Sequence, residues 1–251
     1  MRRNSLPATD RRFSRTELLI GPEGVARLQA AKVAVFGLGG VGSYAVEALA
    51  RAGVGRLVLV DFDDICLTNI NRQLHALSDT IGQPKVEVMA ERVQRINPQA
   101  AVEARREFYS AANGETLLTP DLDYVVDAID HVPAKVDLIL RAKAKGLRLV
   151  SSMGAGNRLD PTKFVVTDLS QTHTDPLARA VRQELRRAGI AHGVQVVFST
   201  ETPRATAGRE WDEKLRREAP GSISFVPAAA GLILASVVVN DLVRDLLPAN
   251  G

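Results

Sequence analysis

Short runs of apolar residues, many of them β-branched, alternate along the first part of the chain with longer segments in which apolar positions recur at helical spacing. These runs predict buried strands at 32–36, 56–60, 101–105, 124–126 and 147–151, with helices at 43–51, 85–96 and 133–145. Strands that alternate with helices are typical of a parallel sheet covered by helices. The pattern therefore predicts an α/β fold with a doubly wound, Rossmann-like, mainly parallel sheet.

The pattern changes in the second part of the chain. Strands are expected at 164–166 and 194–198, on either side of a helix at 176–187. These two strands are predicted to form a C-terminal antiparallel extension of the sheet. Residues 201–221 are polar, mixed in charge and rich in Gly and Pro, which is typical of a long mobile loop.

The two ends of the chain have distinct compositions. Residues 1–13 are basic and lack the apolar region of a secretion signal, so they are interpreted as a loose tail. Residues 222–247 predict an apolar C-terminal helix. Its apolar core, 225–239, contains Pro227 and is shorter than the ~20 residues that a bilayer span needs. A helix buried in the core or in a dimer contact is favoured over membrane association, and no stable membrane insertion is expected.

Composition narrows the class of protein. Hydrophobic residues make up 45% and charged residues 24% of the 251 residues, which is the composition of an ordinary globular protein. The net charge of +3 permits a nucleic acid as a partner. The single cysteine, Cys66, excludes an intrachain disulfide framework, a cysteine-only zinc site and a CxxC redox pair. It also favours a reducing, cytoplasmic location.

A glycine-rich segment with the sequence GLGGVG follows the first predicted strand and opens a helix. Glycines let the backbone approach a phosphate group, and the helix N-terminus supplies N–H donors. An acidic residue at the end of the next strand is placed to bind ribose hydroxyls. The candidate nucleotide-binding residues here are Gly37, Gly39, Gly40, Gly42 and Asp61, and alone they would indicate a dinucleotide enzyme.

The residues that follow indicate a triphosphate instead. Arg72 and Lys85 supply cationic partners that β- and γ-phosphates need and that a dinucleotide does not. The segment DAID ends at Asp130, beyond the strand at 124–126, where ligands of such sheets collect. A carboxylate beside phosphates is typical of Mg²⁺ binding. The sequence therefore predicts a nucleoside triphosphate, with Mg²⁺ beside a carboxylate of this segment.

The ordered set GxGGxG, DxD, NxxRQ, GxxK and DxxD resembles the adenylating domain of the ubiquitin-activating-enzyme superfamily, which includes molybdopterin and thiamine sulfur-carrier activators. By motif the resemblance covers roughly residues 12–152, and we expect the whole chain, 1–251, to be a single adenylating domain. The resemblance implies a catalytic role for Arg15 in the segment RFSR, acting on the ATP of a partner subunit, and hence a homodimer. The residues that the resemblance assigns to ATP or to catalysis are Arg15, Gly40, Asp61, Asp63, Asn69, Arg72, Lys85 and Asp130. It places Asp130 beside the Mg²⁺ ion that accompanies ATP.

The chain lacks features that are usual in sulfur-carrier activators. It has no CxxC zinc pairs, and Cys66 lies between the DxD and NxxR elements, which favours a buried or bystander cysteine. Strings such as NRQLHAL, LDPT, VTDL, DPLA and VFSTE are instead similar to the tRNA threonylcarbamoyladenosine dehydratase branch of the superfamily. That branch implies an enzyme that activates the carboxylate of threonylcarbamoyladenosine in tRNA with ATP and closes a ring with loss of water.

Two alternative functions stay open at this stage. One is adenylation of the C-terminal glycine of a ubiquitin-like sulfur-carrier protein, and the other is a non-catalytic nucleotide-binding partner of a sulfur-transfer system. A cysteine-desulfurase sulfur-transfer system is thus a candidate partner, beside the tRNA substrate. Arg179, Arg182 and Arg186 recur at the spacing of one helix face and form a positive stripe, which indicates either phosphate contacts or a solvated helix face.

Overall fold

The protein is built around one twisted sheet, seen here in a computed structural model that describes residues 11–208, 211–212 and 217–247. The strand order is β3-β2-β1-β4-β5-β7-β6. All neighbouring strands pair in parallel except β6, which is antiparallel to β7. The strands are β1 (Lys32–Phe36), β2 (Arg56–Val60), β3 (Ala101–Arg105), β4 (Tyr124–Asp127), β5 (Leu149–Ser152), β6 (Phe164–Asp168) and β7 (Gln195–Ser199).

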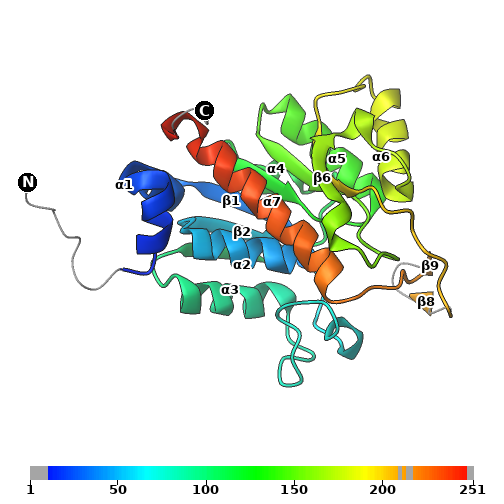
Figure 1. The fold of residues 1–251 in the computed structure, drawn as a ribbon, viewed down its shortest axis with the longest axis horizontal. Coiled ribbons are helices and arrows are strands. Elements are labelled where there is room, and N and C mark those ends of the chain that lie inside the picture. The colour runs from blue at the N-terminus through cyan, green and yellow to red at the C-terminus, as the bar shows by residue number, and fades with distance from the viewer. Residues whose placement is uncertain (1–10, 209–210, 213–216, 248–251) are drawn as a thin grey trace, which may run out of the picture.

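Helices cover both faces of the sheet, because the central strands are apolar on both sides. Figure 1 shows α1, α2, α3 and α7 in front of the sheet, with α5 and α6 toward its other end and behind. One apolar cluster joins the sheet to α2, α3 and α7, and two others join it to α4, α5 and α6. The helices are α1 (Ser14–Ala30), α2 (Gly42–Ala52), α3 (Lys85–Ile96), α4 (Gly114–Leu117), α5 (Val132–Ala144), α6 (Pro176–Arg187) and α7 (Phe225–Val243).

The apolar C-terminal helix α7 packs directly on α2. A Cβ atom at Gly231 would lie 2.2 Å from the carbonyl oxygen of Val41, so the two helices approach as closely as glycine allows. Among the described residues, 225–246 are the one helical segment long and apolar enough to cross a membrane, and 56% of its most apolar window is buried inside the protein. The prediction that this helix lies in the core is consistent with that packing.

The predicted fold class is confirmed, with differences in detail. Strand β6 is antiparallel as expected, but β7 joins β5 in parallel and so extends the main sheet. Helix α1 was not predicted, because Gly21 (φ 72°) and Pro22 interrupt its apolar pattern with a kink. Phe13, which the sequence places in the loose tail, is buried against Gly53, while residues 1–10 of that tail lie outside the described residues.

Parts of the predicted loop at 201–221 are also described. Two short strands, β8 (Trp211–Asp212) and β9 (Arg217–Glu218), pair antiparallel within it. Residues 209–210 and 213–216 lie outside the described residues. The prediction that this loop is mobile stays a prediction.

Candidate active site

The strand order reverses between β1 and β4, and the carboxyl ends of these strands are where ligands of a doubly wound sheet bind. The glycine-rich segment lies at this point, between β1 and α2. Gly37 has φ +86°, and a Cβ there would lie 2.8 Å from the carbonyl oxygen of Ala128, just after β4. A Cβ at Gly42 would lie 1.8 Å from the carbonyl oxygen of Gly37. These two glycines are therefore required by the fold itself.

The two middle glycines have different surroundings. A Cβ at Gly39 would have no neighbouring atom closer than 3.9 Å, so the backbone of this residue is accessible from the site. Gly40 is enclosed, because a Cβ there would lie 3.2 Å from Pro227 and 3.3 Å from the Arg72 side chain. The start of α7 and the NxxR segment thus meet at the glycine-rich segment.

Asp61 ties the end of β2 to the glycine-rich segment. Its Oδ2 atom accepts a hydrogen bond from the backbone N–H of Leu38 at 2.6 Å, and its Oδ1 atom accepts one from the backbone N–H of Asp63 at 2.9 Å. Burial raises the pKa of the Asp61 carboxyl above its usual range, although the nearby charge of Lys85 opposes this effect. The carboxylate is held beside the site at the position expected for ribose binding.

Lys85 is less exposed than a phosphate-facing lysine would suggest. Its side chain is 6% exposed, and its Nζ atom lies 3.0 Å from Oδ2 of Asp63 in an ion pair. Its place in the first turn of α3 explains this burial, and the ion pair with Asp63 holds the ammonium group at the end of β2. The assignment of Lys85 to the phosphates stays a prediction. Lys85 and Asp63 therefore form one polar unit beside Asp61.

Asn69 is the last residue of the short helix η1 (Leu67–Asn69), and Arg72 lies in the loop after it. Arg72 is half-buried, and it donates from Nη1 to the carbonyl oxygen of Thr68 at 2.8 Å and to Oδ1 of Asn71 at 2.9 Å. Asn69 is buried and accepts a hydrogen bond from the backbone N–H of Cys66 at 3.2 Å. Asn69 therefore stabilises the loop, while the Arg72 side chain lies beside Gly40.

Asp130 lies on an exposed turn directly after β4, on the same edge of the sheet as the glycine-rich segment. Arg15 does not join these residues within its own chain. It is exposed at the start of α1, next to Phe13, which packs on Gly53 at the C-terminal end of α2. The glycine-rich segment lies at the N-terminal end of that helix.

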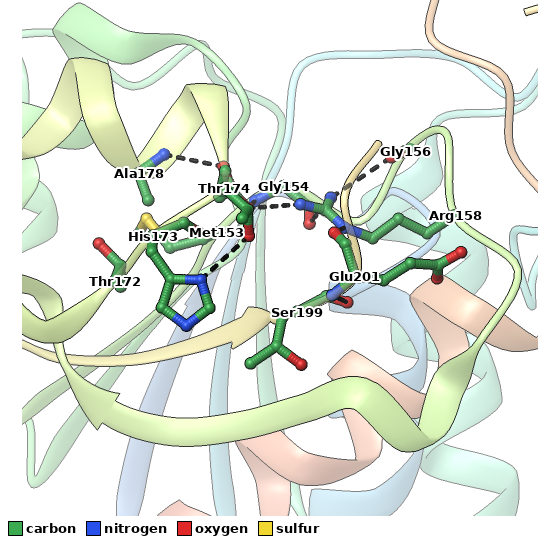
Figure 2. Close-up of polar contacts among 12 residues, drawn as sticks. Met153, Gly154, Gly156, Arg158, Thr172, His173, Thr174, Ala178, Ser199 and Glu201 are labelled. Carbon is green, nitrogen blue, oxygen red and sulfur yellow. Dashed lines mark hydrogen bonds and ion pairs between the residues drawn. The ribbon is translucent and has the colours of Figure 1, made fainter. Parts of the chain in front are cut away.

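The loop after β5 lies at the same carboxyl edge of the sheet as the end of β4, and the sequence analysis did not single out the ion pair that holds it. Arg158 and Asp175 are both 3% exposed and form an ion pair of 3.1 Å. The Asp175 carboxylate also accepts a hydrogen bond from the backbone N–H of Gly154 at 2.9 Å, and Figure 2 shows Gly154 and Arg158 converging at this position. The loop is thereby held at the carboxyl end of β5.

Comparison with known proteins identifies the family. The family model described as "ThiF family" matches residues 13–248, which is nearly the whole chain. This chain belongs to the ThiF family. The resemblance read from the sequence motifs is thereby confirmed at the level of the superfamily.

Individual relatives of this ThiF-family chain are similar over their full length. It is 49% identical to the tRNA threonylcarbamoyladenosine dehydratase of Bacillus subtilis, covering 93% of this chain and 95% of that protein. The corresponding protein of Haemophilus influenzae is 40% identical, with 94% of each chain covered. The crystal structure of the Escherichia coli enzyme TcdA in complex with ATP has a TM-score of 0.86 and 37% identity, covering 96% of this chain and 98% of that one.

Cys66 differs from the expectation of a buried cysteine. It is exposed, and its Sγ atom lies 3.2 Å from Oγ1 of Thr68. The reason is its place at the start of η1, in a loop on the surface of this ThiF-family chain. The part of the prediction that made it a buried residue is wrong.

A fully buried lysine, Lys135 on α5, was also missed. Its Nζ atom donates to Oδ2 of Asp127 at 2.7 Å, to Oγ of Ser151 at 3.0 Å and to the carbonyl oxygen of Ser152 at 2.9 Å. The other carboxylate oxygen of Asp127 accepts a hydrogen bond from the backbone N–H of Ile129 at 3.0 Å. This network fixes the turn that carries Asp130.

We expect Lys135→Met to destabilise the protein strongly. Loss of the ammonium group leaves the buried charge of Asp127 without its ionic partner, which typically costs about 3–5 kcal/mol of unfolding free energy. The matched control is Lys143→Met on the same helix, an exposed lysine whose Nζ atom donates to the carbonyl oxygen of Gly193. Urea unfolding measures both, and equal losses in the two variants would contradict the assigned role of the network.

His75 makes the stability of the folded protein depend on pH. It is 2% exposed, and neither ring nitrogen has a hydrogen-bond partner among the described residues. Burial, with smaller effects from the charges of Lys85 and Arg92, lowers the pKa of His75 to about 3. Below the ordinary pKa of 6.5, the unfolded state therefore binds a proton that the folded state does not. Stability must fall as the pH falls through this window.

A His75→Leu variant should lose this dependence. Between pH 7.5 and pH 5, we expect the unfolding free energy of the unaltered protein to fall by about 2 kcal/mol more than that of the variant. His192→Leu, which removes an exposed histidine, serves as the control and should behave as the unaltered protein does. Urea unfolding at the two pH values provides the measurement. Parallel pH curves for His75→Leu and the unaltered protein would refute the assignment.

Proposed function

We propose that this protein catalyses the ATP-dependent dehydration of threonylcarbamoyladenosine in tRNA, by activating the carboxylate of the threonylcarbamoyl group. The observation that carries the proposal is the full-length similarity to enzymes named for this activity, together with the ATP-bound structure of the E. coli relative. The arrangement of Asp61, Arg72 and Lys85 around the glycine-rich segment supports ATP as the activating substrate. Both alternatives, adenylation of a sulfur carrier and a non-catalytic nucleotide-binding role, lose support because these relatives are named as tRNA threonylcarbamoyladenosine dehydratases. The chain also lacks the CxxC pairs that are usual in sulfur-carrier activators.

The chemistry follows from the poor leaving-group quality of a carboxylate oxygen. That oxygen attacks a phosphorus atom of ATP, and transfer of AMP or phosphate releases diphosphate or ADP. A nitrogen or oxygen of the same threonylcarbamoyladenosine then attacks the activated carbonyl carbon, loses its proton and expels AMP or phosphate. The ring closes, and the oxygen of the lost water leaves on the expelled group. No protein nucleophile is needed, so catalysis rests on positioning and charge stabilisation.

The proposal gives each charged side chain at the carboxyl edge of the sheet a role in binding or activating ATP. Arg72 and Lys85 neutralise charge on the phosphates, and Asp61 orients the ribose. Among the described residues there is no cluster of three or more metal-ligating side chains. Mg²⁺ needs only one or two carboxylates beside phosphate oxygens and water, so the exposed carboxylate of Asp130 fits it. When bound, Mg²⁺ would reduce the repulsion between the phosphates and the incoming carboxylate.

The proposal includes a cytoplasmic homodimer. Leu18 and Leu19 on α1 are 81% and 82% exposed, which is unusual for neighbouring leucines unless another surface covers them. Arg15 lies on the same helix and away from the site of its own chain, as a residue that acts on the partner subunit would. A cysteine-desulfurase system as a further partner rests on the family resemblance alone, and any sulfur transfer to this chain would require Cys66, its single thiol.

Turnover on tRNA from cells that lack this protein tests the function. The unaltered protein should cyclise the threonylcarbamoyl group and release phosphate or diphosphate only when this tRNA and ATP are both present. Arg72→Ala should lower kcat/KM at least about 100-fold, because a charge that stabilises the phosphates is lost. Cys66→Ala should keep most of the activity. Nucleoside analysis by mass spectrometry provides the measurement.

Two outcomes would contradict this proposal. One is stimulation of diphosphate release by a ubiquitin-like carrier protein and not by the tRNA. The other is complete loss of activity in folded Cys66→Ala with a thiol-sensitive covalent intermediate, which would indicate a thioester or persulfide mechanism.

Mixing two inactive variants tests the role of Arg15 across the dimer. If Arg15 serves the partner subunit, a mixed dimer of Arg15→Ala and Asp130→Ala contains one site with both residues intact. Random exchange at equal concentrations should then restore roughly a quarter of the unaltered activity. No recovery, despite subunit exchange demonstrated by mass spectrometry, would show that Arg15 acts within its own subunit or not at all.

A further inference from the structure

Helix α6 has one apolar face and one strongly basic face. Its sequence, PLARAVRQELRR, contains four arginines and one glutamate. Ala178, Val181 and Leu185 are buried and join an apolar cluster with β7 and α5. Arg179 and Arg186 lie on the exposed face, two helical turns apart, so their positions differ by about 10 Å along the helix axis. The helix thus has a basic outer surface on an apolar base.

The four arginines, which are alike in the sequence, have different surroundings. Arg182 is half-buried and donates to the carbonyl oxygen of Thr172 at 2.9 Å and to its hydroxyl, so it holds the loop before α6. Arg187 lies 2.5 Å from the Glu184 carboxylate in an ion pair. Arg179 and Arg186 have no hydrogen-bond or ion-pair partner among the residues that the structure describes. These two guanidinium groups are therefore available to an external anion.

The N-terminal end of α6 is fixed to the carboxyl edge of the sheet, at the loop after β5. Asp175 caps the helix by accepting a hydrogen bond from the backbone N–H of Ala178 at 2.9 Å. The same buried carboxylate holds Gly154 and Arg158 in the loop after β5 (Figure 2). Because β5 pairs in parallel with β4, this loop follows the carboxyl end of β4's neighbour. Because the helix starts at this edge of the sheet and runs away from it, Arg179 lies closer to the site than Arg186 does.

We infer that Arg179 and Arg186 bind the phosphate backbone of the RNA substrate, on the side of the molecule where α6 leads away from the active site. This inference rests on the proposed function. A guanidinium group pairs with a phosphate through parallel hydrogen bonds, and two such groups along one helix match the repeated charge of a nucleic-acid backbone. With the modified nucleotide at the carboxyl edge of the sheet, the neighbouring backbone follows α6. These contacts position the RNA and carry no sequence information.

The double variant Arg179→Gln/Arg186→Gln tests the surface. Binding of tRNA that carries the uncyclised group is measured by fluorescence anisotropy at several KCl concentrations. The variant should bind more weakly, and its slope of log K against log salt should be smaller in magnitude by about 1.5–2, or slightly less than one for each lost contact. Its affinity for ATP, measured by calorimetry, should not change, and its turnover should show a raised KM for tRNA with kcat nearly unchanged.

Arg187→Gln is the matched control, since it removes a charge from the same helix that Glu184 already neutralises. Arg95→Gln, on α3 and paired with Glu91, removes an exposed charge elsewhere. Both should leave the salt slope unchanged. If the unaltered protein binds and cyclises the tRNA while the double variant keeps the same slope and KM, the inference is overturned and the proposed function stands. If the unaltered protein neither binds nor cyclises the tRNA, the proposed function itself fails.

Discussion

The buried ion pair between Lys135 and Asp127 is the contact on which the candidate active site depends. It joins α5 to the ends of β4 and β5, through Ser151 and the carbonyl oxygen of Ser152. The backbone after β4 is then fixed beneath the glycine-rich segment, where the Ala128 N–H donates to the carbonyl oxygen of Phe36. A buried charge of this kind costs desolvation energy, so it is a poor choice for stability alone. What it provides is an anchor for the backbone after β4, the segment that carries Asp130.

Burial divides the charges of the site into two groups. Asp61, Lys85 and Asp127 are buried and held by hydrogen bonds, and Asp130 is exposed to solvent. The buried groups already have partners before any ligand arrives, so they cost little rearrangement when a nucleotide binds. This arrangement suits a reaction that needs positioned charge and no covalent catalyst.

The sequence predicted the sheet and the order of the motifs, because both depend on local patterns: apolar runs for the strands, and glycines or charges at strand ends. It did not predict α1, since Gly21 and Pro22 disguise a kinked helix. It also missed Lys135, which reads as one more charge on an amphipathic helix. Whether Lys85 is buried, and whether Cys66 is exposed, depends on tertiary packing of α3 and η1. No local pattern contains that information.

The same limit explains the four arginines of α6. Their spacing indicates one face of a helix, but a face is wide enough to include both a half-buried position and fully exposed ones. Arg182 is half-buried and donates a hydrogen bond to the carbonyl oxygen of Thr172, which precedes the helix. Glu184 neutralises the charge of Arg187 in an ion pair. The number of arginines that a sequence places on one helix face is therefore the largest number that a partner can contact. In the structure, Arg179 and Arg186 are the two arginines of this helix that remain for a partner. Asp175 sets the direction of the helix that carries them, because it caps α6 and holds Gly154 in the loop after β5.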